Sequence, residues 1–466
     1  MNALPRTAPE AQGASSAGLD AFVTALDEIG DVHSVMVLKG GSVITESWWA
    51  PYAAETPHMM FSLSKSFTST AVGLAIHEGR LSLDDRVIDL LAEDTPAEPG
   101  ENLAAMTVRH LLTMTTGHAA DTVTGVRAEE SGWARVLLAM PVDHVPGTHF
   151  VYNTGATYLL SAIVQKVTGE RLIDYLEPRL FAPLGIVDAA WEQSPDGINT
   201  GGYGLRVLTE DIAKFGQLYL QHGEWEGVQL VPAEWVAEAT SALVPNSGES
   251  INWQSGYGYQ FWQNRDGSYR GDGAFGQFCV VLDDLDAVVV MTGGLSDMKA
   301  PLDAVLELAV PALAGGALDG PALDGPALDG AAPAAEPRTL VTPTPAASAR
   351  EFSQDFFFPT NPLKITRMTI ADTVLTIDGQ EIPFGVGEWV TGGTYKIGNE
   401  VEELAASGGW IDDRHFVVDL RALQTPYSYL ITLAIEGDTI DLRVEQNVSF
   451  APKHSWRLVG GIASGD

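Results

Sequence analysis

Hydrophobic residues in the first part of the chain alternate between helical and strand spacing. Over 19–29 they recur every three or four positions, which predicts an amphipathic helix. The two apolar runs that follow, 34–38 and 42–48, are joined by the turn residues Gly40 and Gly41. A short apolar run, a glycine turn and a second apolar run together predict a β-hairpin.

The same helical and strand spacings of apolar residues predict further elements as far as residue 312. Helices are expected over 107–112, 158–167 and 209–220, and strands over 257–262, 277–282 and 287–292. Hairpins at both ends, with helices between them, indicate an antiparallel sheet whose opening and closing strands pair with each other. The sequence therefore predicts an α+β fold in which helices flank an antiparallel sheet and also form a helical subdomain.

The composition changes abruptly over 314–338, where Ala, Gly and Pro dominate and Ala-Leu-Asp-Gly occurs three times. Such a segment cannot build a packed core, so we expect a linker between a first domain, 1–313, and a second domain, 339–466. Short strands are predicted in the second domain over 363–370, 373–377, 415–420, 427–435, 439–444 and 455–459. They indicate a small all-β domain, either an antiparallel barrel or a sandwich.

The charge and the single cysteine narrow the possible classes of protein. The 61 acidic and 26 basic residues give a net charge of −35, which disfavours nucleic acid and anionic membrane surfaces as partners. No run of about 18 apolar residues occurs, and residues 1–18 lack a basic start followed by an apolar stretch, so a cytoplasmic location is expected. Cys279 lies in an apolar run and is expected to be a buried structural thiol. A homo-oligomer stays possible.

A candidate nucleophile stands at the start of a helical run. Ser62-Leu63-Ser64-Lys65 places a serine and a lysine three residues apart, on one face of the expected helix. A serine hydroxyl becomes a good nucleophile when a neighbouring base takes its proton, and a lysine can be that base when burial lowers its pKa. The helix N-terminus also stabilises the negative charge that develops on an attacked carbonyl. Ser62 and Lys65 are therefore the candidate catalytic pair for acyl transfer, and a solvated helix start is the alternative interpretation of this short pattern taken alone.

Two later segments carry residues that suit the same chemistry. Tyr152 lies between turn signals before a predicted helix, where its phenol can project into a cleft and pass a proton. The segment Gly271-Asp272-Gly273 leads into the strand at Gln277, and a glycine-rich strand edge lets a substrate use backbone N–H groups as donors. A packed aromatic residue and an ordinary turn are the alternative interpretations.

Other catalytic patterns are missing from the sequence. The nucleophile-elbow pattern Gly-x-Ser-x-Gly is broken by Met298, no His-Glu-x-x-His occurs, and there is no P-loop or dinucleotide fingerprint. The ten histidines do not cluster at the spacing of metal ligands, and His144 and His149 are interpreted as turn residues. We therefore expect neither a metal nor an organic cofactor.

In this order and at these separations, the segments at Ser62, Tyr152 and Gly271 resemble the three motifs of the serine β-lactamase-like superfamily. The superfamily includes class C β-lactamases, penicillin-binding DD-peptidases, family VIII carboxylesterases, D-aminopeptidases and 6-aminohexanoate-oligomer hydrolases. The resemblance covers residues 15–312, and segments 60–66, 79–85 and 107–117 also resemble it.

The resemblance implies a role for each matching position. Ser62 would be the acylated nucleophile, Lys65 its proton partner and Tyr152 the general base and acid. The oxyanion hole would use the backbone N–H of Ser62 and that of Phe275 or Gly276. The positions expected to contact substrate are Asn153, Thr154, Gly271, Asp272 and Gly273.

Two positions depart from the pattern of the superfamily. The second motif often reads Tyr-x-Asn, whereas here Asn153 follows Tyr152 directly and Thr154 holds the second place. The third motif usually reads Lys-Thr-Gly or His-Thr-Gly in β-lactamases and DD-peptidases, whereas here it contains Asp272. A carboxylate in place of a cation would repel the carboxylate of a β-lactam or of a D-Ala-D-Ala peptide.

The sequence therefore predicts a serine hydrolase that forms an acyl-enzyme on Ser62 and cleaves an ester or amide of a small molecule or short peptide. A β-lactamase, a DD-peptidase or a D-aminopeptidase is the alternative, and a non-catalytic binding module on the same fold is the second. The C-terminal domain can cap the cleft, set substrate size or mediate dimer contacts. Further candidates for lining the cleft are Tyr203, Arg206, Trp253 and Gln277.

Overall fold

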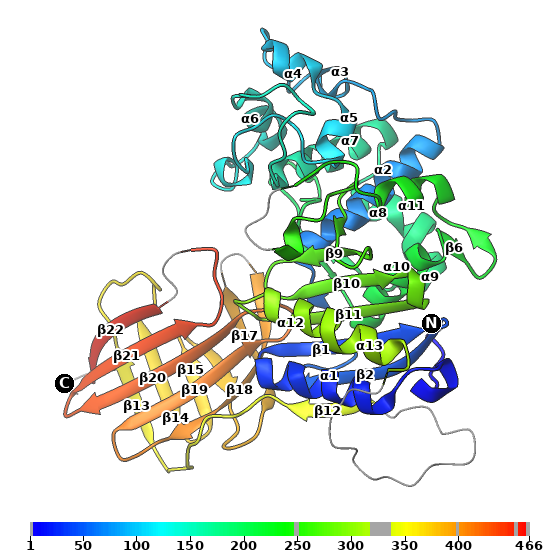
Figure 1. The fold of residues 1–466 in the computed structure, drawn as a ribbon. Helices are drawn as coiled ribbons and strands as arrows, with labels where there is room; N and C mark the ends of the chain where they lie inside the picture. Colours follow the sequence, from blue (N-terminus) through cyan, green and yellow to red (C-terminus); the bar gives the residue numbers. More distant parts are fainter. Residues whose placement is uncertain (1–2, 247–250, 317–336, 398–399, 452–454, 463–466) are drawn as a thin grey trace.

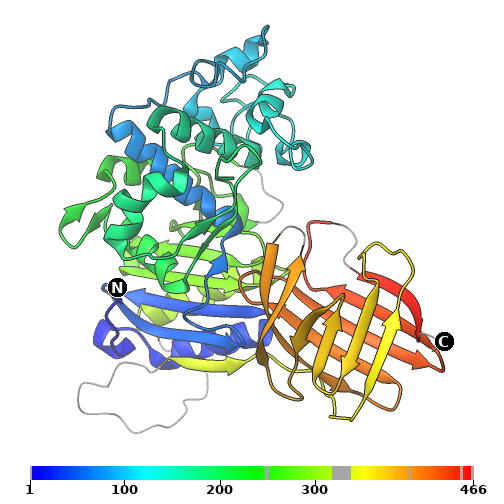
Figure 2. The ribbon, with the colours of Figure 1, turned by 180° about the vertical axis from the view of Figure 1, so that it is seen from behind.

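The structure is a computed structural model that describes residues 3–246, 251–316, 337–397, 400–451 and 455–462. Most of the predicted linker lies outside the described residues. A domain of mixed helices and strands lies beside an all-β domain, as the front view and the view from behind both show (Figures 1 and 2).

One sheet forms the centre of the first domain, with its described strands in the order β12-β2-β1-β11-β10-β9-β8. The strands are β1 (Val32–Lys39), β2 (Ser42–Ala50), β8 (Trp262–Gln263), β9 (Tyr269–Gly273), β10 (Gln277–Leu282), β11 (Ala287–Gly293) and β12 (Arg338–Val341). β1 pairs antiparallel with both β2 and β11, which confirms the expected pairing of the opening and closing strands. β12, which begins at the last residue of the predicted linker, joins this sheet by pairing parallel with β2.

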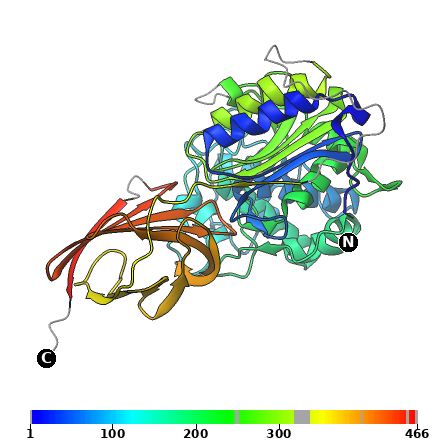
Figure 3. The same cartoon turned by 90° about the horizontal axis from the view of Figure 1, so that it is seen from below.

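The two faces of the sheet carry different helices because alternate strand residues point to opposite sides. Val35 and Val280 belong to the apolar cluster that packs under α1 (Ser16–Ile29), α12 (Lys299–Ala304) and α13 (Val310–Leu313). Figure 3 shows α1 in blue beside the yellow-green helices on this face. Met36 and Cys279 belong to the cluster on the opposite face, and the burial of Cys279 confirms the expected structural thiol.

The opposite face is covered by a helical region that follows β2 and precedes β8. Its helices are α2 (Ser64–His77), α3 (Val87–Leu90), α4 (Glu101–Ala105), α5 (Val108–Leu112), α6 (Trp133–Ala139), α7 (Thr154–Thr168), α8 (Leu172–Leu176), α9 (Ala182–Leu184), α10 (Thr209–Leu220) and α11 (Ala233–Ala239). Its short strands are β3 (His58–Met59), β4 (Ala190–Trp191), β5 (Leu205–Val207), β6 (Glu224–Trp225) and β7 (Val228–Gln229). α2 and α7 pack against each other, which brings the first two motifs together.

Most of the elements predicted for this domain are confirmed, and two of the predictions were inaccurate. α7 begins at Thr154, four residues before the predicted start, because Asn153 caps it by accepting a bond from Gly155 N–H. The strand predicted over 257–262 is wrong except at its last residue, since only Trp262–Gln263 is a strand there. No helix in the described residues has the length and apolar content needed to cross a membrane.

The second domain is a nearly closed barrel, which resolves the choice between barrel and sandwich. Its strands are β13 (Ser353–Phe357), β14 (Arg367–Ala371), β15 (Val374–Ile377), β16 (Gln380–Pro383), β17 (Val390–Ile397), β18 (Glu400–Trp410), β19 (His415–Ala422), β20 (Ser428–Glu436), β21 (Thr439–Gln446) and β22 (Ser455–Ile462). The two end strands, β16 and β17, lie side by side, and Lys396 N–H donates to Gln380 Oε1 at 3.1 Å. The predicted strand at 363–370 begins only at Arg367.

Polar contacts tie the barrel to the first domain. Arg421 of β19 pairs with Asp31 at 2.7 Å, and Arg206 of β5 pairs with Glu402 of β18 at 3.1 Å. The loop after β21 adds a hydrogen bond from Asn447 Nδ2 to the Gly294 carbonyl at 3.0 Å. The barrel is therefore held against the first domain at several points.

Gly294 lies where two barrel loops meet the end of β11, so a substitution at this position tests how tightly the two domains pack there. A Cβ atom there would stand 2.4 Å from the Pro426 carbonyl oxygen and 2.8 Å from Asn447 Nδ2. Because backbone has to move to relieve such a contact, we expect Gly294→Val to lower the free energy of unfolding by about 1–3 kcal/mol. Denaturant unfolding measures this, with Gly100→Val as the control because its Cβ meets open space. Equal losses in the two variants would contradict the tight junction.

Candidate active site

Ser62 lies in a short 3-10 turn, Phe61–Leu63, that leads directly into α2. Its Oγ accepts a hydrogen bond from Lys65 Nζ at 3.0 Å. The serine and the lysine therefore face each other across one helical turn, as their spacing predicts.

Lys65 is buried, with 1% of its surface exposed, although it carries a titratable amine. Its Nζ also donates to the Gly202 carbonyl at 2.8 Å and contacts Thr154 Oγ1 at 3.3 Å. Burial lowers the pKa of Lys65 to about 7, while the carboxylates of Asp121 and Asp272 act to raise it. A large fraction of Lys65 is therefore uncharged near neutral pH and has a lone pair available.

Tyr152 stands on the other side of Lys65, with the amine 4.9 Å from the centre of its ring. The ring stacks on Trp262 at 5.3 Å and meets the edge of Tyr257 at 6.2 Å, and these contacts fix its direction. Burial and the carboxylate of Asp272 raise the pKa of Tyr152 far above its ordinary value, and a hydrogen bond with Ser62 acts in the opposite direction. The phenol is thus neutral at physiological pH and can act as a proton donor.

Asn153 and Thr154 occupy different environments although both were expected to bind substrate. Asn153 Oδ1 accepts hydrogen bonds from Thr122 Oγ1 at 2.8 Å and from Gly155 N–H at 3.0 Å, so this buried side-chain amide holds the start of α7. Thr154 instead lines the cleft and contacts Lys65. Of these two residues, only Thr154 contacts Lys65, and its contact is longer than the one from Lys65 to the Gly202 carbonyl.

The glycines of the third segment are required by the close approach of β9 to the turn that carries Ser62. A Cβ on Gly273 would stand 2.1 Å from the Met60 carbonyl oxygen, and one on Gly271 would stand 2.4 Å from Leu63 Cδ1. Both glycines therefore serve the packing of β9 against the segment that carries Ser62.

Asp272 lies in the cleft but its charge is locally compensated. Its Oδ2 accepts from Arg270 Nε at 3.0 Å and from Trp253 Nε1 at 2.9 Å, and only 7% of its surface is exposed. Arg270 is itself fully buried. Because a buried arginine offsets the aspartate, the repulsion of substrate carboxylates that the sequence predicts is much weaker than for a free anion.

A cleft of about 380 Å³ opens over Ser62. Its walls are Phe61, Ser62, Asp121, Val123, Thr124, Arg127, Tyr152, Thr154, Tyr203, Trp253, Trp262, Asp272, Ala274, Met298 and Phe450. The cleft includes Ala274, but neither Phe275 nor Gly276 lines it. Ala274, the residue directly after the glycine segment, therefore lines the same cleft as Ser62, whereas the two residues expected there do not.

Four residues outside the motifs were expected near the cleft, and two of them lie there. Tyr203 and Trp253 line it, whereas Arg206 pairs with the barrel and Gln277 bonds to the backbone at Ala274. Asp121, Arg127 and Phe450 were not predicted, because no local pattern marks them and tertiary packing alone brings them to the cleft.

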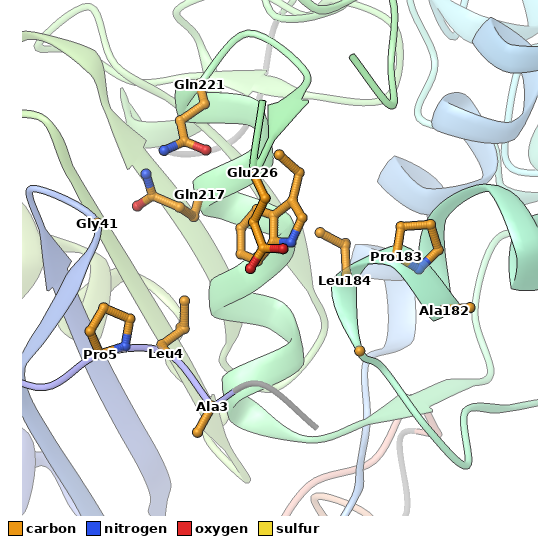
Figure 4. Close-up of a pocket in the computed structure, with 12 residues that line it drawn as sticks. Ala3, Leu4, Pro5, Gly41, Ala182, Pro183, Leu184, Gln217, Gln221 and Glu226 are labelled. Carbon is orange, nitrogen blue, oxygen red and sulfur yellow. The ribbon is translucent and has the colours of Figure 1, made fainter. Parts of the chain in front are cut away.

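A second pocket, of about 470 Å³, lies away from Ser62, between the segment at Ala3–Pro5 and the C-terminal part of α10 (Figure 4). Its polar lining residues are Gln217, Gln221 and Glu226. These side chains include no nucleophile paired with a base, so the smaller cleft over Ser62 is the candidate active site.

Comparisons of the sequence identify a matching family and similar proteins. A family model described as Beta-lactamase matches residues 19–309, which is more than half of the 466 residues. The 6-aminohexanoate-dimer hydrolase of Paenarthrobacter ureafaciens is 26% identical over 334 residues, which cover 62% of this chain and 84% of that protein.

Solved structures share the fold at low sequence identity. The octameric penicillin-binding protein homologue of Pyrococcus abyssi matches with a TM-score of 0.53 and 16% identity, covering 95% of this chain and 99% of that one. EstCE1, a hydrolase with promiscuous acyltransferase activity, matches with a TM-score of 0.52 and 18% identity, covering 65% of this chain and all of that one. The first match extends over the barrel as well as the domain that carries Ser62.

Proposed function

The chain belongs to the Beta-lactamase family, and from this premise we propose that it is a serine hydrolase that forms an acyl-enzyme on Ser62. The substrates would be esters or amides of small molecules or short peptides. The observation that supports this most directly is the 3.0 Å contact between Ser62 Oγ and the buried amine of Lys65. A neutral amine at this distance can take the hydroxyl proton as the nucleophile attacks.

In the first step, Ser62 Oγ forms a bond to the substrate carbonyl carbon and its proton passes to Lys65 Nζ. The carbonyl oxygen becomes an oxyanion, for which the backbone N–H groups of Ser62 and Ala274 are the proposed donors. Ala274 is chosen over Phe275 and Gly276 because it alone of the three lines the cleft. Such donors stabilise charge that appears only as the reaction proceeds.

In the second step, the tetrahedral intermediate collapses and the C–O or C–N bond breaks. The leaving alcohol or amine takes a proton from the Tyr152 phenol, which recovers one from the Lys65 ammonium. Water then attacks the acyl-enzyme, giving up a proton to Lys65, and the free acid leaves as Ser62 regains its hydroxyl. The raised pKa of Tyr152 favours Lys65 as the base and Tyr152 as the donor.

Linear esters and amides are the proposed substrates rather than β-lactams. A relative named for the hydrolysis of 6-aminohexanoate dimers supports an amide, and a similar fold described as a hydrolase with acyltransferase activity supports acyl chemistry. The argument from Asp272 against β-lactams is weakened by its pairing with Arg270, so turnover of a cephalosporin beside p-nitrophenyl butyrate is the direct comparison.

The pH dependence of ester hydrolysis tests the proposed base. Because burial lowers the pKa of Lys65 to about 7, the ammonium predominates below pH 7 and cannot accept a proton. We expect kcat/KM for p-nitrophenyl butyrate to rise about tenfold per pH unit up to pH 7 and then to level off. A rate that does not level off until pH 10 would show that the amine has an ordinary pKa and would contradict this role.

Asp211 provides the control for that profile. Burial raises the pKa of Asp211 to about 6, and its Oδ2 accepts from Leu208 N–H at 3.1 Å, away from the cleft-lining residues. Asp211→Asn keeps the acceptor oxygen and removes the titration. The rise in rate near pH 7 is expected to persist in this variant, whereas its loss would assign the titration to Asp211.

A further inference from the structure

Two residues on either side of the oxyanion site have a strained backbone. Phe61, which precedes the nucleophile, has φ of 44°, and Phe275, which follows Ala274, has φ of 70°. The left-handed region is unfavourable for residues with large side chains, so such a conformation persists only where surrounding contacts hold it. The two rings meet edge to face with their centres 5.4 Å apart.

The contacts that hold these two rings come from the barrel. Tyr427 directly precedes β20, and the centre of its ring lies 6.2 Å from that of Phe61 and 6.1 Å from that of Phe275. Val448, on the loop after β21, is buried in the same cluster. A chain segment far from the motifs in sequence thus packs directly behind the nucleophile turn.

The loop after β21 is itself fixed to the first domain. Asn447 Nδ2 donates to the carbonyls of Gly294 and Pro426, and its Oδ1 accepts from Ser428 N–H at 2.9 Å. One amide side chain therefore connects both barrel loops to the end of β11. This anchoring sets the position of Phe450, three residues further along the loop.

Phe450 lines the cleft over Ser62. One part of its ring packs on Phe275 at 4.8 Å and on Phe61 at 5.8 Å, while 61% of its surface remains exposed. Trp253, Ala274 and Met298 also line the cleft and are apolar over most of their surface. When an apolar group of a bound molecule covers a half-packed aromatic ring, the buried apolar surface stabilises the complex.

We propose that Phe450 is a specificity-determining residue, contributed by the barrel, that selects substrates whose acyl group carries an aromatic ring or another bulky apolar group. The inference rests on the proposed function, since it concerns the acyl group that Ser62 would carry. The acyl group would stay bonded to Ser62 until water releases it, in the cleft that Phe61 and Phe450 both line, so a contact with Phe450 would act on both steps. The barrel is then a part of the active site rather than an appended module.

Two esters with the same leaving group test the proposal: p-nitrophenyl acetate and p-nitrophenyl 4-phenylbutyrate. The ratio of their kcat/KM values, phenylbutyrate over acetate, is expected to fall about three- to tenfold in Phe450→Ala, as for the loss of one aromatic pair. Phe450→Tyr keeps the ring and is expected to hold the ratio within about twofold of the unmodified protein. Phe357→Ala is the matched control, because Phe357 is an exposed phenylalanine on β13 that does not line the cleft.

Each result has a separate meaning. An unchanged ratio in Phe450→Ala, or an equal loss with both esters, would overturn the specificity role, because a merely structural residue affects both substrates alike. The same fall in Phe357→Ala would also overturn it. Ester hydrolysis that survives in Ser62→Ala would instead overturn the proposed function, so the two failures are distinguishable.

Discussion

Replacement of Ser62 by alanine is expected to lower kcat/KM for p-nitrophenyl butyrate by about 10⁴-fold or more. The variant has no nucleophile for the substrate carbonyl, and what remains is binding in the cleft and the N–H donors around it. Ser62 Oγ contacts Lys65 Nζ but is only partly buried, so its loss leaves little unsatisfied in the core. The fold is expected to be retained, and thermal unfolding measured alongside the rates checks this.

Ser69→Ala is the matched control for this variant. Ser69 lies in the same helix, α2, and its buried hydroxyl has no hydrogen-bond partner among the described residues. Removing an unpartnered hydroxyl costs no hydrogen bond, so its rates are expected to stay within about twofold of the unmodified protein. Substantial turnover in Ser62→Ala, with normal turnover in Ser69→Ala, would place the chemistry on another residue.

Replacement of Lys65 by methionine is expected to lower kcat/KM by about 10³-fold, within the range for a lost general base. Methionine keeps the length and volume of the side chain but has no amine to take the proton of Ser62. Tyr152 cannot replace it as the base near neutral pH, because burial and Asp272 raise the pKa of the phenol too far. The rise in rate near pH 7 is expected to disappear together with the activity.

The stability of the Lys65→Met variant separates a catalytic role from a structural one. A buried amine is costly to desolvate, and its removal avoids this cost. The free energy of unfolding of Lys65→Met is therefore expected to stay within about 1 kcal/mol of that of the unmodified protein, despite the lost hydrogen bond to the Gly202 carbonyl. Lys166→Met on α7, where Lys166 is half exposed and pairs with Glu93, is the control for a lysine outside the site. A Lys65→Met protein that unfolds at lower temperature but keeps its rate would mean that the lysine only supports the fold.

The sequence predicted those features that depend on local spacing. The three-residue separation of Ser62 and Lys65 is enough to bring them together once a helix begins there. The hairpins at the two ends of the first domain predicted that β1 and β11 pair, and they do. In the barrel, clear alternation predicted β19, β20 and β21 close to their observed bounds.

Features that depend on distant packing were not predicted. β17 and β18 are rich in glycine and charged residues, so the alternation of apolar and polar residues that marks a strand is weak. Packing explains one of these glycines: a Cβ on Gly408 would stand 2.3 Å from the Val417 carbonyl oxygen of β19. The pairing of Asp272 with Arg270 weakens the electrostatic argument drawn from the aspartate alone. Phe450 reaches the cleft across the junction of the two domains, and no spacing within the sequence indicates this.

The acyl-enzyme itself is the central claim, and intact-mass spectrometry tests it most directly. The protein is mixed with p-nitrophenyl butyrate and quenched in acid within the first turnovers, beside Ser62→Ala treated in the same way. The account predicts a mass increase equal to one butyryl group in the unmodified protein, located by peptide mapping on Ser62 and missing from the variant. Release of p-nitrophenol without any adduct on Ser62, or an equal adduct in Ser62→Ala, would contradict it.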